Sequence, residues 1–350
     1  MKVIKIDKSS WAKGIDKARE TYQLFGPVKD KTIVVFKVLD QGVLPEMEYT
    51  DSVLSAKSVV FPQTEKILGA SLDESHEDHH ILKRPDTDYS PRAVLGIRPF
   101  DARALKLVQL NFDTKDYRDP YWCDSYEATT FIGLAVNEPS VFDFSTRTGT
   151  GPFDEEGLDV LLVDVKDEYL GKVLTDKGEA FLKAAGFTQE ADAKAALKII
   201  DDLKTNAEKS ITAEINTDKL KGKTILELYE APFWDDLAFS CINCGTCTYV
   251  CPTCWCFDIQ DEARGKSCSR FRNWDTCMDP LFTLHGSGHN PRGEKTQRVR
   301  QRFMHKLKYF LDKYDAGIMC VGCGRCVKHC PVNIDIREVC NTMNSYEKQE

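Results

Sequence analysis

Cysteine is almost absent from the first two thirds of this chain. Of its 14 cysteines, only Cys123 lies before residue 240, and the other thirteen follow it. A disulfide framework does not explain this distribution, because such frameworks belong mainly to small secreted domains that bury too little apolar surface. In a chain of 350 residues that is 42% apolar, clustered cysteines indicate metal or redox chemistry.

Three further absences narrow the class of protein. No run approaches the ~20 apolar residues of a membrane span, so we expect a cytoplasmic protein without direct membrane insertion. The formal net charge is -8, whereas nucleic-acid binding needs a basic face, so we expect no nucleic-acid partner. There is no G-x-x-x-x-G-K-[ST] loop, and GTGPFDEEG (149–157) is not a dinucleotide fingerprint. We therefore expect no nucleotide binding by this chain, although flavin contact at a subunit interface is compatible with the sequence.

The first part of the chain alternates between strand-like and helix-like patterns. Apolar, β-branched runs predict buried strands at 32–39, 93–97, 129–136 and 159–165. Helical spacing occurs at 101–112, at 172–185 and, as a surface helix, at 189–209. The alternation predicts a mixed α/β domain over residues 1–230. The cysteine-rich remainder, residues 231–350, forms a second domain in this interpretation.

Two cysteine runs in that remainder share one spacing, C-x2-C-x2-C-x3-C-P. In two-cluster ferredoxins three cysteines of a run bind one [4Fe-4S] cluster, and the fourth, before the proline, binds the other cluster. The spacing therefore predicts a small α+β ferredoxin-like dicluster domain with helical insertions. The ligands of cluster I would be Cys241, Cys244, Cys247 and Cys330, and those of cluster II would be Cys320, Cys323, Cys326 and Cys251.

Zinc is the main alternative ligand for paired cysteines, since structural zinc sites also use C-x2-C pairs. Two complete runs with matching spacing and matching prolines disfavour it. Radical chemistry with S-adenosylmethionine needs a three-cysteine motif with an open iron, whereas both runs here supply a fourth ligand. Two closed clusters indicate electron transfer rather than substrate activation.

The order of the C-terminal motifs resembles one protein family. CINCGTCTYVCPTCWC (241–256), WDTCMDP (274–280), HGSGHNPRG (285–293) and MCVGCGRCVKHCP (319–331) are similar to the iron-sulfur electron-transfer subunit of anaerobic sulfite reductase and the β subunit of cytoplasmic sulfhydrogenases. Related subunits serve flavin oxidoreductase complexes coupled to heterodisulfide reductase. FGPV (25–28), GIRPFDARAL (96–105) and GTGPFDEEGLDVLLVDV (149–165) extend the likeness to the N-terminal domain.

The resemblance implies a non-catalytic electron-transfer subunit in an anaerobic hetero-oligomeric complex. Its partners would be a catalytic subunit of the hydrogenase, sulfite reductase or heterodisulfide reductase type and a flavin-containing NAD(P)H or ferredoxin oxidoreductase subunit. The alternative is a self-sufficient iron-sulfur reductase with its own substrate site, which would need a flavin, an open metal position or a nucleophile.

Cys254, Cys256 and Cys277 exceed what two clusters need. Relatives carry C-F-C where this chain reads Asp143, Phe144, Ser145. If the family builds a third cluster, Asp143 can replace the lost thiol as its fourth ligand; otherwise the three thiols are remnants. Cys268 and Cys340 are interpreted as structural residues.

Three other segments attract notice. SHEDHH (75–80), with His76, His79 and His80, is interpreted as a solvated acidic loop rather than a metal site, and HGSGHNPRG as a tight loop near a cluster. Residues 292–313 hold eight Lys or Arg against two acidic residues, with an apolar helical face. Arg298, Arg302 and Lys306 lie largely off that face, which leaves two interpretations. In the first, they form a solvated basic face of an ordinary amphipathic helix. In the second, they have a function: they dock an acidic partner, or their electric field makes reduction of the anionic clusters easier.

Overall fold

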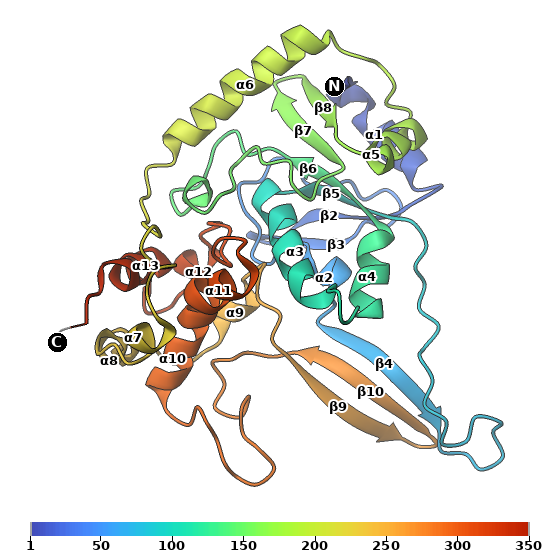
Figure 1. Ribbon diagram of the computed structural model, residues 1–350. Helices are drawn as coiled ribbons and strands as arrows, with labels where there is room; N and C mark the ends of the chain where they lie inside the picture. Colours follow the sequence, from blue (N-terminus) through green and yellow to red (C-terminus); the bar gives the residue numbers. More distant parts are fainter. Residues whose placement is uncertain (1, 349–350) are drawn as a thin grey trace.

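The computed structural model describes residues 2–348. A mixed sheet of seven strands, in the order β1-β8-β7-β6-β5-β2-β3, forms the larger part of the molecule (Figure 1). Four neighbouring strands run parallel: β2 (Gln23–Asp30), β5 (Arg92–Ile97), β6 (Thr129–Leu134) and β7 (Val160–Val165). β3 (Ile33–Val38) and β8 (Glu168–Val173) are antiparallel to their neighbours, and β1 (Val3–Asp7) pairs with β8. The chain is thus a mixed α/β protein, as its alternating pattern predicts.

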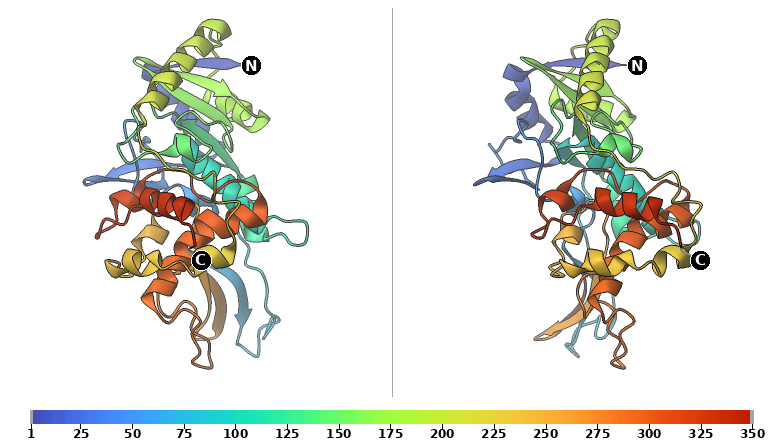
Figure 2. Two further views of the ribbon diagram at one scale, coloured as in Figure 1. Left: turned by 60° about the vertical axis from the view of Figure 1, so that its left-hand side comes forward. Right: turned by 90° about the vertical axis from the view of Figure 1, so that its left-hand side faces the viewer.

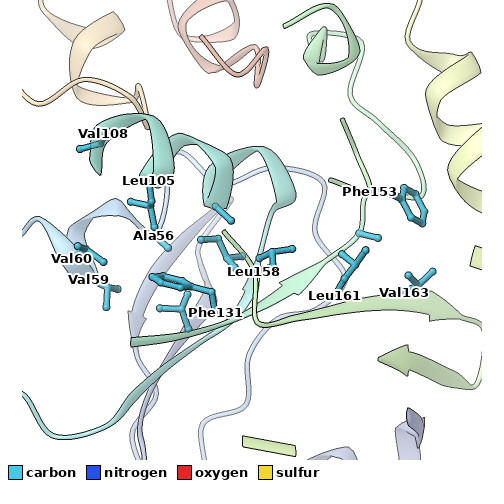
Figure 3. Packing of buried hydrophobic residues seen from close by; sticks show 14 of the residues in the cluster. Ala56, Val59, Val60, Leu105, Val108, Phe131, Phe153, Leu158, Leu161 and Val163 are labelled. Atoms are coloured by element: carbon cyan, nitrogen blue, oxygen red, sulfur yellow. The ribbon is translucent and has the colours of Figure 1, made fainter. Parts of the chain in front are cut away.

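Helices cover both faces of this sheet. α1 (Lys8–Ala18) and α5 (Asp176–Ala185) pack on one face, while α2 (Lys57–Val60), α3 (Pro99–Phe112) and α4 (Pro120–Glu127) pack on the other. Leu105 of α3 faces Phe131 of β6 in the core between them (Figure 3). Central strands buried on both faces read as continuous apolar runs, which is why β5, β6 and β7 could be predicted.

Two predicted details of this sheet are wrong. The run at 32–39 does form strand β3, but β3 is an edge strand and is half-buried to exposed rather than buried. The helix expected from residue 172 begins only at Asp176, because residues 168–173 form β8. The surface helix expected at 189–209 is α6 (Ala193–Ser210), which buries only Ala196, Ile200 and Ala207.

A second, three-stranded sheet joins segments far apart in the chain. β4 (Thr64–Ser71) pairs with β10 (Ser267–Trp274), which pairs with β9 (Phe257–Arg264), all antiparallel. Arg272 of β10 is buried and forms ion pairs with Glu65 of β4 and with Asp119, the N-cap of α4. The boundary at residue 230 stays a prediction, and this sheet crosses it.

Short helices form the C-terminal part around a core of their own. Figure 2 shows them below the seven-stranded sheet, beside the three-stranded one. They are α7 (Ile225–Tyr229), α8 (Phe233–Phe239), α9 (Thr246–Tyr249), α10 (Lys295–Met304), the π-helical turn η2 (His305–Tyr309), α11 (Phe310–Tyr314), α12 (Arg325–Lys328) and α13 (Ile336–Ser345). Across residues 2–348, no helix combines the length and apolar character needed to cross a membrane.

Candidate metal centre

The two cysteine runs fold into loops with the same backbone pattern. In the first, Asn243 and Gly245 have φ of 56° and 73°; at the equivalent positions of the second, Gly322 and Gly324 have φ of 67° and 71°. This left-handed region is open to glycine and tolerated by asparagine. Gly245 and Gly324 are the N-caps of α9 and α12, which contact one another. The loops are therefore repeats placed side by side.

One cavity collects cysteines from both runs. Cys241, Cys244 and Cys247 line it together with Cys330, between walls that include Val299, Phe303 and Ile336. Two backbone amides donate to sulfur here: Asn243 N lies 3.4 Å from Cys241 Sγ, and Ile334 N lies 3.2 Å from Cys330 Sγ. The cavity thus holds every residue of the predicted first ligand set. Cys244 is exposed, so this set reaches the molecular surface.

The second predicted set is more deeply buried. Burial raises the pKa of the Cys320 thiol to about 12 and also raises the pKa of Cys323 and Cys326. The charge of Cys251 contributes to all three shifts, so the last cysteine of the first run lies near the first three of the second. Its thiol is also hydrogen-bonded to that of Cys254. Cys326 also lines the first cavity. The two sets therefore adjoin.

The surroundings of these thiols fit a metal cluster. Burial also raises the pKa of Cys247 to about 11, so the free thiol would stay protonated at neutral pH. A coordinated thiol is deprotonated outright, because the metal supplies the compensating positive charge. The apolar walls and the N–H···S contacts are those that hold iron-sulfur clusters and adjust their potentials.

The three remaining thiols share a separate cavity of about 270 Å³. Cys254, Cys256 and Cys277 line it together with His305 and Lys306. A hydrogen bond between Cys256 and Cys277 lowers the pKa of Cys256 to about 7 and raises that of Cys277. Burial lowers the pKa of His305 to about 4, which keeps its imidazole neutral. The sequence analysis did not single out His305, because a histidine within a basic helical segment gives no sign that it lines a cysteine-containing cavity.

Asp143 is not among the residues that line this cavity. Its buried carboxylate accepts a hydrogen bond of 2.7 Å from Ser145 N, and burial raises its pKa. The next residue, Phe144, donates its N–H to Gly322 O at 2.8 Å. The structure therefore brings Asp143 beside the 320–326 loop instead of beside the three extra thiols.

The interpretation of Arg298, Arg302 and Lys306 as a solvated or docking face is wrong. Their exposed fractions are 7%, 4% and 2%. Arg302 Nη2 donates to Cys247 O at 3.3 Å, and Lys306 Nζ donates to Thr253 Oγ1 at 2.8 Å. Burial alone would lower the pKa of Arg302, but the nearby thiols, Cys247 and Cys326 foremost, outweigh it and raise that pKa. The helix is buried on two sides, and of these three cations Arg302 and Lys306 face the cysteine loops, whereas Arg298 donates to Arg292 O and Gly293 O.

Two more buried cations come from elsewhere in the chain. Lys57 of α2 donates to Cys254 O at 2.7 Å and to Cys251 O at 3.1 Å. Arg325, which lies between Cys323 and Cys326, forms a bidentate ion pair of 2.6 and 2.7 Å with Asp101 of α3. Both side chains of that pair are 1% exposed. The α/β domain is therefore joined directly to the second cysteine loop by this buried ion pair.

The histidine-containing loops lie apart from these cavities. His285 and His289 stand on an exposed loop with their ring centroids 5.4 Å apart, and only Arg292, near its end, lines the three-thiol cavity. His76, His79 and His80 are half-buried to exposed near β4. Over residues 2–348, no three His, Cys, Asp or Glu side chains are placed to hold one metal ion. In a cubane each thiolate binds a different iron, so its ligands stand farther apart.

Comparison with known proteins identifies the class of protein. Residues 240–334 match the family model of a 4Fe-4S dicluster domain, so the C-terminal part of this chain holds two [4Fe-4S] clusters. Over its whole length the chain is similar to sulfhydrogenase 2 subunit beta of Pyrococcus furiosus, with 26% identity over 338 residues that cover 96% of each chain. These two matches bear out the resemblance to the iron-sulfur β-subunit family that was inferred from the motifs. No solved structure matches it.

Proposed function

We propose that this chain relays electrons between a catalytic oxidoreductase subunit and a flavin-containing NAD(P)H or ferredoxin oxidoreductase subunit, in a cytoplasmic complex of anaerobic metabolism. One observation carries the proposal: Cys326 belongs to the second cysteine set and also lines the cavity of the first. Two clusters in these positions are neighbours. Each cluster, when bound, takes up and releases one electron at a time.

The proposed ligands follow the crossed pattern. Cys241, Cys244, Cys247 and Cys330 hold cluster I, and Cys320, Cys323, Cys326 and Cys251 hold cluster II. The repeated left-handed backbone positions and the contact between α9 and α12 support a ferredoxin-like domain with helical insertions. The protein's own residues exclude water, donate N–H groups to sulfur and surround the thiolates with buried cations. Together these favour the uptake of an electron by an anionic cluster.

The surface around Cys244 is the proposed exit of the relay. Phe239 is 84% exposed and Ile242 is 62% exposed, and both flank Cys241 in the chain. Large apolar side chains that are both exposed and adjacent are typical of interaction sites. Cluster II, by contrast, faces the α/β domain through Arg325 and Asp101. We infer that one partner subunit docks over Phe239 and Ile242.

A third cluster at Cys254, Cys256 and Cys277 is proposed separately, and its support is their shared cavity with buried cations. In this cavity the fourth ligand would be His305 rather than Asp143. Iron analysis of anaerobically purified protein tests it: about twelve irons per chain fit three clusters, and about eight contradict the third. If Asp143→Ala instead of His305→Ala removes about four irons, the assignment to His305 is wrong.

The relay itself is tested by reconstitution. Co-purification under anaerobic conditions followed by mass spectrometry identifies the partner subunits; the name of the relative favours a sulfhydrogenase. Ile242→Ser combined with Phe239→Ser is expected to slow electron transfer to the catalytic partner without changing iron content. Ile81→Ser, at an apolar residue that is 49% exposed near the three-stranded sheet, is the matched control. Equal transfer rates in both variants contradict the exit surface.

The self-sufficient reductase is the second candidate, and the same preparation distinguishes it. Such an enzyme reduces a substrate with the purified chain and an artificial donor alone. The relay requires the catalytic subunit for turnover, and the clusters of the isolated chain only become reduced. Dithionite bleaching of a broad absorption near ~400 nm verifies that the clusters are present.

A further inference from the structure

A cavity of about 490 Å³ lies outside the cysteine-rich part, at the carboxyl ends of the parallel strands. Arg98 follows β5 directly, residues 135–138 follow β6, and Asp164 is near the end of β7; all of them line the cavity. In α/β proteins small molecules bind preferentially at this edge, in cavities of about 300 to 1,000 Å³. Neither cysteine set uses this place in the fold.

Arg98 is a buried cation in the wall of this cavity. It is 3% exposed, and its Nη1 donates to Leu134 O at 3.3 Å and Ala135 O at 3.2 Å. Its guanidinium lies 3.9 Å from the centre of the Tyr49 ring. In the part of the chain that the structure describes, no acceptor is hydrogen-bonded to its buried Nε. Buried donors are usually paired, so this guanidinium has bonding capacity left for a ligand.

Asn137 offers the opposite kind of group. Its Nδ2 donates to Asp164 O at 2.8 Å, while its buried Oδ1 accepts no hydrogen bond from any residue in 2–348. Glu138 adds a carboxylate to the same lining, whereas the Asp164 carboxylate is already paired with Lys8 Nζ at 2.9 Å. A ligand that satisfies both sides needs an anionic group for Arg98 and hydroxyl or amino donors for these oxygens. Arg98 is also the N-cap of α3, whose positive end favours the anion.

We propose that this cavity binds a small organic anion, a phosphate or a carboxylate, that also carries hydroxyl or amino groups. The site adjoins the second cysteine loop. Val136 lines the cavity and packs in one apolar cluster with Val321 and Cys323. The first turn of α3, which begins after Arg98, carries Asp101 to its ion pair with Arg325. A ligand here therefore lies next to the part of the α/β domain that holds that loop.

Calorimetric titration of the full-length, cluster-loaded chain tests the proposal. The probes are sn-glycerol 3-phosphate and L-glutamate, which distinguish the two kinds of anion, with inorganic phosphate as the anion that lacks donors. We expect one organic probe to saturate a single site and to bind at least about tenfold more tightly than inorganic phosphate. Failure of both to bind at about 5 mM overturns the proposal.

Variants locate the binding. Arg98→Lys removes Nε and the planar fork and should weaken binding about tenfold, and Asn137→Ala should weaken it similarly. Arg19→Lys is the matched control, because Arg19 also donates to two backbone carbonyl oxygens but lies outside the cavity. Cluster absorbance verifies that each variant is folded. If Arg98→Lys does not fold, Asn137→Ala decides alone; binding equal to that of Arg19→Lys overturns the site.

Discussion

Breaking the ion pair between Asp101 and Arg325 should strongly destabilise the protein. Both side chains are 1% exposed, and two hydrogen bonds of 2.6 and 2.7 Å join them. Asp101→Leu leaves the guanidinium buried, with Ser52 as its only acceptor within residues 2–348, through its carbonyl and its hydroxyl. Removing one partner of a buried pair costs about 3–5 kcal/mol, because an uncompensated charge stays buried.

The assay is anaerobic urea unfolding, followed by far-UV circular dichroism and by loss of cluster absorbance. With a slope on the order of 3 kcal/mol/M, the expected loss lowers the midpoint by about 1 to 1.7 M. Arg325→Met should cost a similar amount, since it leaves the Asp101 carboxylate unpaired. The double variant Asp101→Leu/Arg325→Met removes both charges and should recover most of the loss.

Two results would refute this reasoning. If either single variant unfolds at the wild-type midpoint, the pair does not carry the contact between the α/β domain and the 320–326 loop. If the double variant is as unstable as the worse single variant, packing rather than unpaired charge explains the loss. Lys221→Ala is the control, because its partner Asp315 and Lys221 itself are largely exposed. We expect it to leave the midpoint almost unchanged.

Three further predictions concern the cysteine-rich part. Arg302→Gln removes a buried positive charge beside the cysteines. At roughly 6 Å from a cluster and an effective dielectric constant of about 20, the loss of this charge lowers the reduction potential of the cluster by on the order of 100 mV. Redox titration followed by electron paramagnetic resonance measures this; Arg302→Lys and Arg300→Gln should not shift it comparably, and an unchanged potential contradicts it. When His305 holds no iron, burial lowers its pKa from 6.5 to about 4, so in cluster-free protein the unfolded chain takes up the proton first. Stability should fall as the pH drops from about 6.5 to about 4, and His305→Gln should flatten this profile by up to roughly 3 kcal/mol in pH-dependent urea unfolding; an unaltered profile argues against it. In Gly322→Ala the new Cβ would lie 2.4 Å from the backbone at the start of η1 (Ser145–Arg147). The Gly322→Ala variant should therefore lose about four irons per chain. Gly317→Ala, also at positive φ but in open space, should keep its iron. Equal iron contents in the two variants would show that the clash does not disturb the cluster.

Local sequence patterns predicted the central strands and the grouping of the cysteines into ligand sets. β5, β6 and β7 are short apolar runs buried on both faces, so their composition alone identifies them. The half-buried strands β4 and β10 and the largely exposed strand β9 were not predicted, because their residues are mixed or largely polar. The pairing of β4 with β10 also joins segments about 200 residues apart. Such pairing depends on tertiary contacts that periodicity does not contain.

In the cysteine-rich site, too, local features could be predicted and features that depend on tertiary packing could not. The spacing of each cysteine run is local, and it predicted which thiols share a cavity. Arg302 could not be placed from the helical pattern, because a helix buried on two sides has no solvated face for its cations. Asp143 was expected near the extra thiols, but the segment that contains it packs against Gly322 instead. Only the three-dimensional arrangement decides which loop that segment meets.

The pairing of β4 with β10 also sets an order of events during synthesis. β4 leaves the ribosome roughly 190 residues before β9 and β10, and at 5–20 residues per second the wait is about 10 to 40 s. During this interval β4 has an unpaired edge, to which strands of other chains can pair. Iron-sulfur cluster insertion comes later still, since Cys320 to Cys330 are translated near the end. Productive folding of this chain therefore depends on protection of a nascent edge strand, in addition to the supply of iron and sulfide.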